Sequence, residues 1–297
     1  MTTTTSPGAH TAGAADTAGA TDATGEGSAP PAPADPSDEG RIGLRSHLRH
    51  IGALVRRNAL QIKQDPDSMA DALLMPIIFT LLFVYVFGGA ISGQGNREEY
   101  VNYLVPGLMA MMGLSIAMAV GTGVNTDVSK GVMDRFRSMP IARSSVLIAK
   151  IVVEIGRMTI AMTILLCMGF LLGMELGTSV WRLFAAMGLS LLFGASLMWI
   201  FILLGLTVKT AQAVQGLAML ILIPLQFGSS IFASPSTMPG WLRTFTDYNP
   251  LSNLADAARA LINGGEFASS VWWTLGWAAA ITAVTAPLAI AKFRKHT

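Results

Sequence analysis

The chain has 297 residues, of which 52% are hydrophobic and only 13% are charged. Soluble domains carry about 25% charged residues, so this composition excludes an ordinary soluble protein. Apolar stretches of about 20 residues recur, and each is long enough to cross a ~30 Å hydrocarbon core as a helix, whereas a membrane β-barrel would show alternating segments of about 10 residues. The sequence therefore predicts an all-α integral membrane protein.

The first 40 residues form a tail rich in Thr, Ala, Gly and Pro, with six acidic residues and no Lys or Arg. Such a segment buries too little apolar surface to offset the entropy of ordering it, so we expect disorder there. Residues 41–66 instead have an apolar stripe at helical spacing with basic residues beside it, which predicts an amphipathic helix at the membrane interface. The stripe consists of Leu44, Leu48, Ile51, Val55 and Ile62. The Asp65-Pro66 pair ends this helix, because a residue before proline avoids the α conformation.

Residues 67–297 hold six apolar stretches that we expect to form a six-span transmembrane domain. The stretches lie at about 72–91, 103–123, 151–172, 183–208, 214–232 and 271–291. An even number of spans places both termini on one side, and that side carries fifteen Lys and Arg residues against four on the other. Because positive residues favour the cytoplasmic side, we expect a multi-pass cell-membrane protein with both termini in the cytoplasm.

A charged island, Asp127–Lys150, interrupts the apolar second half of the chain between the second and third predicted spans. It carries five Lys and Arg residues and a break at Met139-Pro140. The distribution of charge places the island in the cytoplasm, where a soluble protein could push on the membrane domain. A solvated connector with positive residues is the other interpretation that the residues alone allow.

The segment 233–270 lies between the fifth and sixth predicted spans, on the outer side. Asn249 is a good helix N-cap, Pro250 suits the first helical position, and Gly264 is a good helix stop. One apolar face runs between them, formed by Leu251, Leu254, Ala258 and Leu261. We expect a short helical hairpin that lies against the outer membrane surface and is too polar to be a seventh span.

Several catalytic and ligand-binding motifs are missing from the sequence. It contains no G-x-x-x-x-G-K-[ST] phosphate-binding loop, no His/Cys pattern of metal ligands and no catalytic motif. We therefore predict that the chain is not itself an enzyme and holds no cofactor or metal. Asp65, Asp67 and Asp71 resemble the magnesium-binding Asp-rich motifs of membrane prenyltransferases, but their spacing differs and no second acidic cluster exists. An integral-membrane enzyme acting on a lipid or isoprenoid substrate stays an alternative on these residues.

Charged residues inside the predicted spans are few. Glu154 and Arg157, three residues apart at the inner end of the third span, can form an ion pair on one helix face. Charges inside spans usually mark ion or proton pathways, so this scarcity argues against an ion-coupled secondary transporter, the second alternative. The energy source of a transporter would then lie outside the chain.

Two blocks of sequence resemble the ABC transporter permeases of the type-2 exporter family, especially the daunorubicin-resistance-type drug-efflux permeases. In the island, Lys130-Gly131 followed by DRFRSMPIAR at 134–143 resembles the cytoplasmic-loop motif of that family. The outer segment, with MPGWL at 238–242, NPL at 249–251 and DAAR at 256–259, resembles the block before the last span. Phe136 replaces the usual Leu and Lys130 replaces a frequent acid. The resemblance covers about residues 45–295.

The resemblance implies a permease subunit that exports a hydrophobic drug or lipid-like compound with ATP hydrolysed by a separate ATP-binding-cassette subunit. ATP and Mg would bind that partner, a second permease subunit would complete the transporter in the lipid bilayer, and nothing points to nucleic acid. The family's coupling helix would include Gly131, Met133, Asp134, Arg135, Phe136, Arg137, Pro140 and Arg143. Candidate residues of a substrate route are the polar positions Thr122, Gln226, Ser229 and Ser230 inside the spans, which are more typical of hydrogen bonds between helices.

Overall fold

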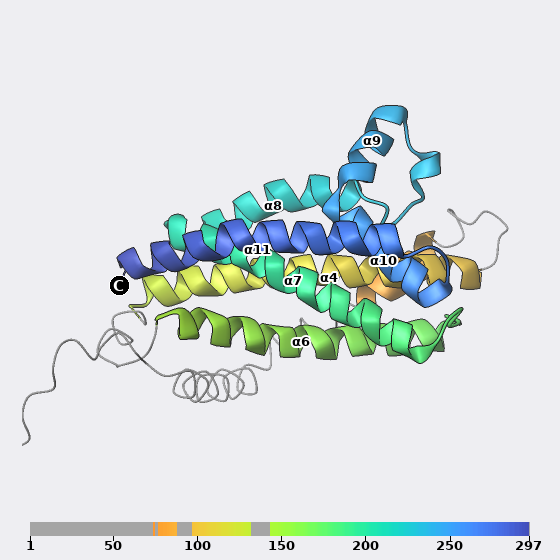
Figure 1. Ribbon diagram of the computed structural model, residues 1–297, viewed down its shortest axis with the longest axis horizontal. Helices are drawn as coiled ribbons and strands as arrows, with labels where there is room; N and C mark the ends of the chain where they lie inside the picture. The colour runs from red at the N-terminus through yellow and green to blue at the C-terminus, as the bar shows by residue number, and fades with distance from the viewer. Residues whose placement is uncertain (1–73, 75–76, 88–96, 132–142, 297) are drawn as a thin grey trace, which may run out of the picture. The chain divides into compact units, whose positions relative to one another are not determined.

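The computed structural model describes residues 74, 77–87, 97–131 and 143–296, and every regular element in this part of the chain is a helix (Figure 1). These residues all belong to one unit of the chain, Ile42–Thr297. The all-α prediction is confirmed for them. The predicted tail at 1–40 and the predicted amphipathic helix at 41–66 lie outside the described residues.

Among the described residues, four helices are long and apolar enough to cross a membrane. They are α4 (Arg97–Ser129), α6 (Arg143–Leu171), α7 (Val180–Thr207) and α11 (Ala268–His296), and they correspond to the second, third, fourth and sixth predicted spans. The other two predicted spans coincide with shorter apolar helices. One covers Ile77–Val86 and overlaps the π-helical turn η2 (Phe83–Phe87), and the other is α8 (Ala211–Phe227). With 17 residues at 1.5 Å each, α8 is about 26 Å long, slightly less than the hydrocarbon core.

Helix α4 lies at the centre of this arrangement, with α7 as its main neighbour (Figure 1). In its most apolar window 78% of the residues are buried, against 17% for α11, so α11 is peripheral. Glycines allow the close approach of α4 and α7: a Cβ on Gly205 would lie 2.3 Å from the carbonyl oxygen of Gly121. Small residues at helix contacts are the usual means of tight packing in membranes, where burial of apolar surface against another helix gains little over lipid.

Helix α8 is held to the other helices by a narrow contact. Only Val214, Ala218 and Leu222 of this helix are buried, which is one stripe at four-residue spacing, and its neighbours are α4 and, to a smaller extent, α7. The other faces of α8 expose large apolar side chains, including those of Leu220 and Phe227. The helix continues through Pro224 and ends at Gly228, earlier than the predicted span end near residue 232.

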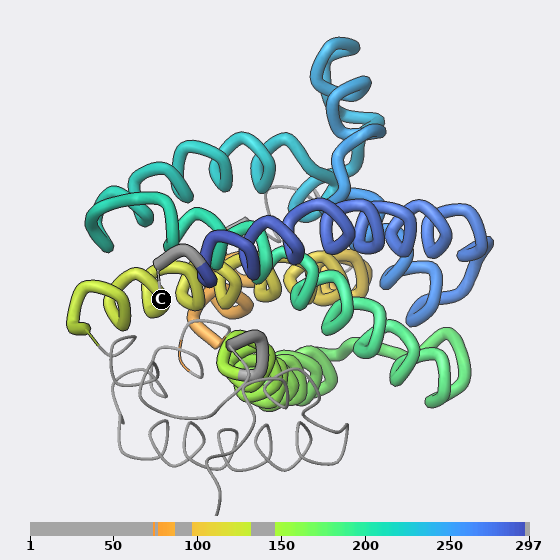
Figure 2. Tube along the Cα trace, turned by 60° about the vertical axis from the view of Figure 1, so that its left-hand side comes forward, coloured from red at the N-terminus to blue at the C-terminus, as the bar shows by residue number. Residues whose placement is uncertain are grey.

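Between α8 and α11 the chain forms η3 (Pro235–Thr237), α9 (Gly240–Tyr248) and α10 (Pro250–Asn263). The predicted start of α10 is confirmed, because the Asn249 side chain accepts a hydrogen bond from the Leu251 N–H at 2.9 Å and Pro250 is the first helical residue. Gly264 ends the helix with a φ of 97°, a conformation that favours glycine. The four residues of the predicted apolar face are buried. Figure 2 shows α9 standing out from the long helices at one end.

Candidate functional site

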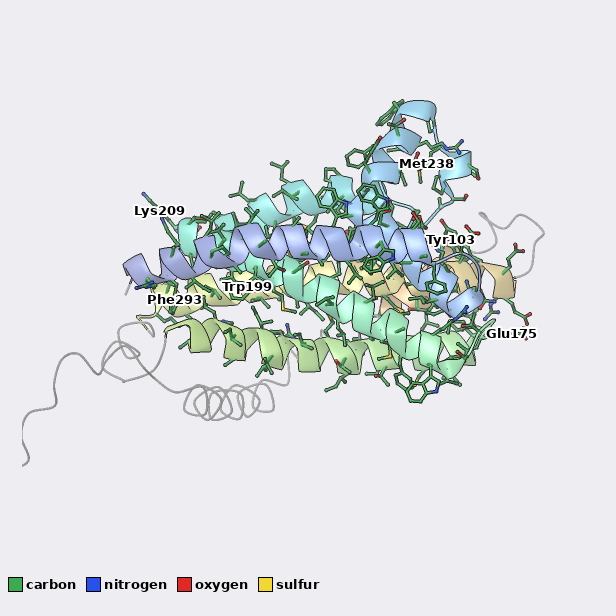
Figure 3. All side chains as sticks on the ribbon, in the orientation of Figure 1. Tyr103, Glu175, Trp199, Lys209, Met238 and Phe293 are labelled. Carbon is green, nitrogen blue, oxygen red and sulfur yellow. The ribbon has the colours of Figure 1, made fainter. Side chains whose placement is uncertain are left out.

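Polar contacts between helices concentrate at the two ends of the long helices. Figure 3 shows Lys209 near one end and Tyr103, Glu175 and Met238 near the other. The first end, here named the island end, also holds the last turn of α4, the first turn of α6 and the C-terminal part of α11 (Figure 1). The opposite end is named the hairpin end, after α9 and α10.

An ion pair joins α4 to α6 at the island end. The Lys150 ammonium donates a hydrogen bond to the Asp127 carboxylate at 2.6 Å, and both side chains are partly exposed. A Cβ on Gly123 would lie 3.2 Å from Nζ of Lys150, so this glycine leaves room for the ammonium group. Asp127 and Lys150 are the first and last residues of the charged island, and their contact brings its two flanks together.

A buried asparagine joins α4 to the end of α7. Nδ2 of Asn125 donates to the carbonyl oxygens of Gly205 at 2.9 Å and Val208 at 2.6 Å. Carbonyls in the last turn of a helix have no partner within the helix, so Asn125 satisfies groups that would otherwise be unpaired away from water. The island end of α4 is thus bonded to α7 and paired with α6.

Most of the predicted coupling residues lie outside the described residues: Met133, Asp134, Arg135, Phe136, Arg137 and Pro140. The structure describes the positions on both sides of them. Gly131 follows α4 with a φ of 67°, and its N–H donates to the Val128 carbonyl at 3.1 Å, an arrangement typical of a glycine that ends a helix. Arg143 begins α6.

Glu154 and Arg157 lie on one face of α6, and Nη2 of Arg157 is 2.7 Å from Oε2 of Glu154. Only 13% of the Glu154 side chain and 12% of the Arg157 side chain are exposed. Because each charge neutralises the other, the pair is tolerable within an apolar span.

The four candidate route residues do not form one continuous line. The Thr122 hydroxyl, near the island end of α4, donates to the Met118 carbonyl of its own helix at 3.1 Å. Gln226, Ser229 and Ser230 lie together at the hairpin end, where the Ser229 hydroxyl donates to the Gln226 carbonyl at 2.5 Å. Both hydroxyls therefore bond local backbone, and among these four residues only the Ser230 side chain bonds another side chain in the described structure.

Ser230 belongs to a polar group at the hairpin end, here named the Arg259 cluster, which consists of Tyr103, Ser230, Ser252, Asp256 and Arg259. The Arg259 guanidinium donates to the Tyr103 carbonyl at 2.9 Å, the Ser230 carbonyl at 2.6 Å and the Asp256 carboxylate at 2.7 Å. It lies over the Tyr103 ring, 3.7 Å from the centroid. The Ser230 hydroxyl donates to Asp256 at 2.8 Å, and the Ser252 hydroxyl accepts from the Ser230 N–H at 3.1 Å.

Burial lowers the pKa of Arg259 from its ordinary value, while Tyr103 and Asp256 act in the opposite direction. An arginine starts from so high a pKa that the guanidinium stays charged at physiological pH. Among the described residues no group of three His, Cys, Asp or Glu could hold a metal ion. The hydrogen bonds and ion pairs at both ends join side chains to backbone carbonyls and to other side chains of neighbouring helices, an arrangement suited to holding these helices in fixed positions.

Comparison with known proteins identifies the family of this chain. The model of the family described as "ABC-2 type transporter" matches residues 49–263. The chain belongs to the ABC-2 type transporter family. The match spans the whole island and the hairpin through the end of α10, and the family resemblance expected from the sequence is confirmed.

Three of the relatives are named as permeases, and two of these three as permease proteins of ABC transporters. The chain is 36% identical over 238 residues to the daunorubicin resistance ABC transporter permease protein DrrB1 of Streptomyces coeruleorubidus, covering 80% of this chain and 83% of the relative. It is 31% identical over 228 residues to the doxorubicin resistance ABC transporter permease protein DrrB of Mycobacterium tuberculosis, covering 71% and 77%. A putative transport permease, ycf38 of Cyanophora paradoxa, is 24% identical over 229 residues, covering 76% and 79%.

Sequence reasoning missed two sets of contacts in this ABC-2 type chain. Asn125 lies two residues beyond the second predicted span, and an amide so close to the end of a span could have marked it as a hydrogen-bond donor between helices. Arg259 was counted only as an outer charge, although it is the last residue of the DAAR block. Asp256 is three residues away and the spacing could have indicated that ion pair, but the partners on α4 and after α8 lie far away in sequence, so no local pattern indicated them.

Proposed function

We propose that this chain is the membrane subunit of an ATP-driven exporter, which moves a hydrophobic drug or lipid-like compound out of the cell. The family match over residues 49–263 carries the proposal. The printed names of the daunorubicin and doxorubicin resistance permeases support the class of cargo. The scarcity of charge inside the apolar helices suits an apolar cargo, because an ionic one would need paired groups along its path.

In this proposal ATP and Mg bind a separate ATP-binding-cassette subunit, which docks on the island. The residues from Gly131 to Arg143 form the coupling segment, and the Asp127–Lys150 ion pair transmits its displacement to α4 and α6 together. Asn125 extends this connection to α7. Support comes from the positions of the Asp127–Lys150 ion pair and of the two hydrogen bonds that Asn125 donates to α7. Asp127 and Lys150 are the ends of the island, and Asn125 lies two residues before it.

The membrane arrangement in this proposal has six spans, with Ile77–Val86 and α8 as the cores of the first and fifth, and both termini in the cytoplasm. The island end and the C-terminal part of α11 lie at the same end of the long helices, as this orientation requires (Figure 1). A second permease subunit, identical or different, completes the transporter in the cell membrane. The exposed apolar faces of α8 and α11 support burial in lipid or against that subunit.

The coupling segment is tested with the double substitution Phe136→Ala and Arg137→Glu. Loss of an apolar contact and reversal of a charge should abolish co-purification with the ATPase subunit and transport, while membrane insertion stays normal. Lys209→Glu is the matched control, because Lys209 is exposed at the same end but lies outside the island. Retained association and efflux in the double variant would refute the position of the coupling segment. Transport that survives ATP depletion but collapses with an ion gradient would refute the ATP-driven mechanism.

A further inference from the structure

The chain that follows α8 leaves the helical conformation while it is still buried. Ser229, Ser230 and Ile231 are all buried, and side chains of α9 and α10 bond the backbone around them. Nδ2 of Asn249 donates to the Leu225 carbonyl at 2.7 Å and the Gly228 carbonyl at 2.9 Å. Irregular backbone at membrane depth is tolerated only where protein groups satisfy it, so the hairpin is what permits α8 to end here.

The same hairpin bonds the first turns of α4. Pro106 lies inside α4 and has no N–H, so the Asn102 carbonyl lacks its usual partner four residues later. Nδ2 of Asn263 donates to that carbonyl at 2.8 Å, and Nε of Arg259 donates to the next one, at Tyr103. Arg259 and Asn263 are four residues apart on α10 and therefore share one helix face.

Arg259 is the residue that joins both sets of contacts. Nη2 of Arg259 donates to the carbonyls of Ser230 and Ile231, while its Nε bonds α4. The Tyr103 hydroxyl, also from α4, donates to the Ser230 carbonyl at 2.6 Å. The space is tight, because a Cβ on Gly107 would lie 2.6 Å from the Ile231 carbonyl oxygen and 3.0 Å from Nη2 of Arg259.

Separating these groups would leave a buried guanidinium and several carbonyls without partners. Removing one partner of a buried charged group disfavours a state about a hundredfold or more, so the cluster should not open in each transport cycle. Within the described part of the chain, the buried side chains of α8 are those of the stripe Val214, Ala218 and Leu222. Its first residue, Ala211, follows exposed Lys209 and Thr210 at the island end. The contacts of α8 are thus strong at one end and weak along its length.

We propose that Arg259 is a positioning residue that keeps the hairpin end of α8 fixed to α4 during transport, so that α8 tilts about this end and its Ala211 end moves. The proposal rests on the proposed function as an ATP-driven exporter. It places the moving end of α8 beside the island, on the side that receives work from the ATPase. The Arg259 cluster is then a pivot that stays closed in all states.

Distances between pairs of spin labels test this proposal. The chain contains a single cysteine, Cys167, so Cys167→Ser gives a background for labels on introduced cysteines. Exposed Glu99 and Phe227 form the hairpin-end pair, and exposed Ser129 and Gln212 form the island-end pair; each pair joins α4 to α8. Both are measured in the complete transporter with its ATPase subunit in lipid vesicles, with and without a non-hydrolysable ATP analogue.

The expected result is a hairpin-end distance that stays within about 2 Å on nucleotide binding while the island-end distance shifts by more than this. A hairpin-end shift as large as the island-end shift would overturn the pivot. An island-end distance that does not respond to nucleotide would also overturn it, provided that transport is intact. These distances are measured in an assembled and active transporter. If the pivot proposal is wrong, the transporter still forms and works but the distances differ from those expected; if the exporter proposal is wrong, no active transporter with an ATPase subunit forms.

Variants of the cluster give a second test, which needs no ATPase subunit. Arg259→Ala should broaden the hairpin-end distance distribution in the chain alone, and Arg259→Lys should restore it only in part, because an ammonium cannot span three carbonyls. Tyr103→Phe removes only the hydrogen bond from the Tyr103 hydroxyl to the Ser230 carbonyl, so it replaces Arg259→Ala as the test variant if Arg259→Ala does not fold. Arg243→Ala is the control, since Arg243 is exposed in the same hairpin.

In the complete transporter, Tyr103→Phe and Arg259→Lys should lower the transport per ATP hydrolysed by about tenfold, while ATPase association and turnover stay within about twofold. A purely structural role would lower the amount of assembled transporter without changing this ratio. Sharp hairpin-end distances and unchanged transport per ATP in both variants would overturn the proposal.

Discussion

Replacing Gly205 with Ala should force α4 and α7 apart at their closest contact. The added Cβ would lie 2.3 Å from the Gly121 carbonyl oxygen, whereas ordinary contacts begin at 3.4 Å, so the helices must separate by about 1 Å. Overpacking of this kind costs about 1–3 kcal/mol. The separation would also weaken the hydrogen bonds from Asn125 to Gly205 and Val208, worth about 1 kcal/mol each. The higher helix propensity of alanine returns up to about 1 kcal/mol, so the expected loss in the free energy of unfolding is about 2–4 kcal/mol.

The same helix offers a matched control at Gly188, where a Cβ would meet nothing within 4 Å. Gly188→Ala should be neutral or stabilise the chain by up to about 1 kcal/mol, because alanine has the higher helix propensity. The assay is thermal unfolding of the purified chain in detergent, followed by circular dichroism. A Gly205→Ala chain that unfolds at the same temperature as the Gly188→Ala chain would refute the close helix contact as a source of stability.

Three further predictions concern polar groups at or near the island end. Lys150→Asp should reduce transport, and the swapped pair Asp127→Lys with Lys150→Asp should recover most of it; the effect on stability stays below about 1 kcal/mol, because Asp127 is 40% exposed. Asn125→Asp removes the amide donor and should lower the free energy of unfolding by about 2–3 kcal/mol in the thermal assay, so an unchanged transition would contradict the role of that amide. Glu154→Gln leaves Arg157 without its partner and should lower the free energy of unfolding by about 3 kcal/mol, whereas adding Arg157→Met should recover much of the loss; a double variant no more stable than the single one would contradict the unpaired arginine as the cause.

Local chemistry made the hairpin predictable from sequence. Asn249 caps α10 because its side chain replaces a missing backbone acceptor, Pro250 suits a position whose N–H has no helical partner, and Gly264 adopts a φ that other residues avoid. Each of these rules involves residues that are adjacent in sequence. They therefore hold without knowledge of the tertiary structure.

Helix ends inside the membrane domain were less predictable. The second span was expected at about 103–123, but α4 covers Arg97–Ser129, because a hydropathy pattern ends where polar residues begin and backbone hydrogen bonding continues past that point. The fifth span was expected to reach about 232, but α8 ends at Phe227, where side chains from the hairpin bond the backbone in place of helix.

Of the contacts of Arg259, only the ion pair with Asp256, three residues away, could be read from sequence. Its other hydrogen bonds reach residues 156 and 29 positions away, so neither spacing nor periodicity marks them. An arginine outside the apolar stretches suggests a solvated charge, and only the folded arrangement of α4, α10 and the end of α8 buries it. The island's coupling residues stay a prediction, because those between Gly131 and Arg143 lie outside the described part of the chain.

The Asp127–Lys150 contact has a consequence for how such transporters diversify. Residues 23 positions apart in sequence meet at 2.6 Å, so the segment between them leaves and rejoins the helices at one fixed place. The entropy of closing such a loop changes only slowly with its length, so substitutions and insertions within it need not disturb the helices. Replacing residues 130–142, which lie between α4 and α6, with the corresponding segment of a related permease should change which ATPase co-purifies with the chain, while the membrane domain keeps its thermal stability.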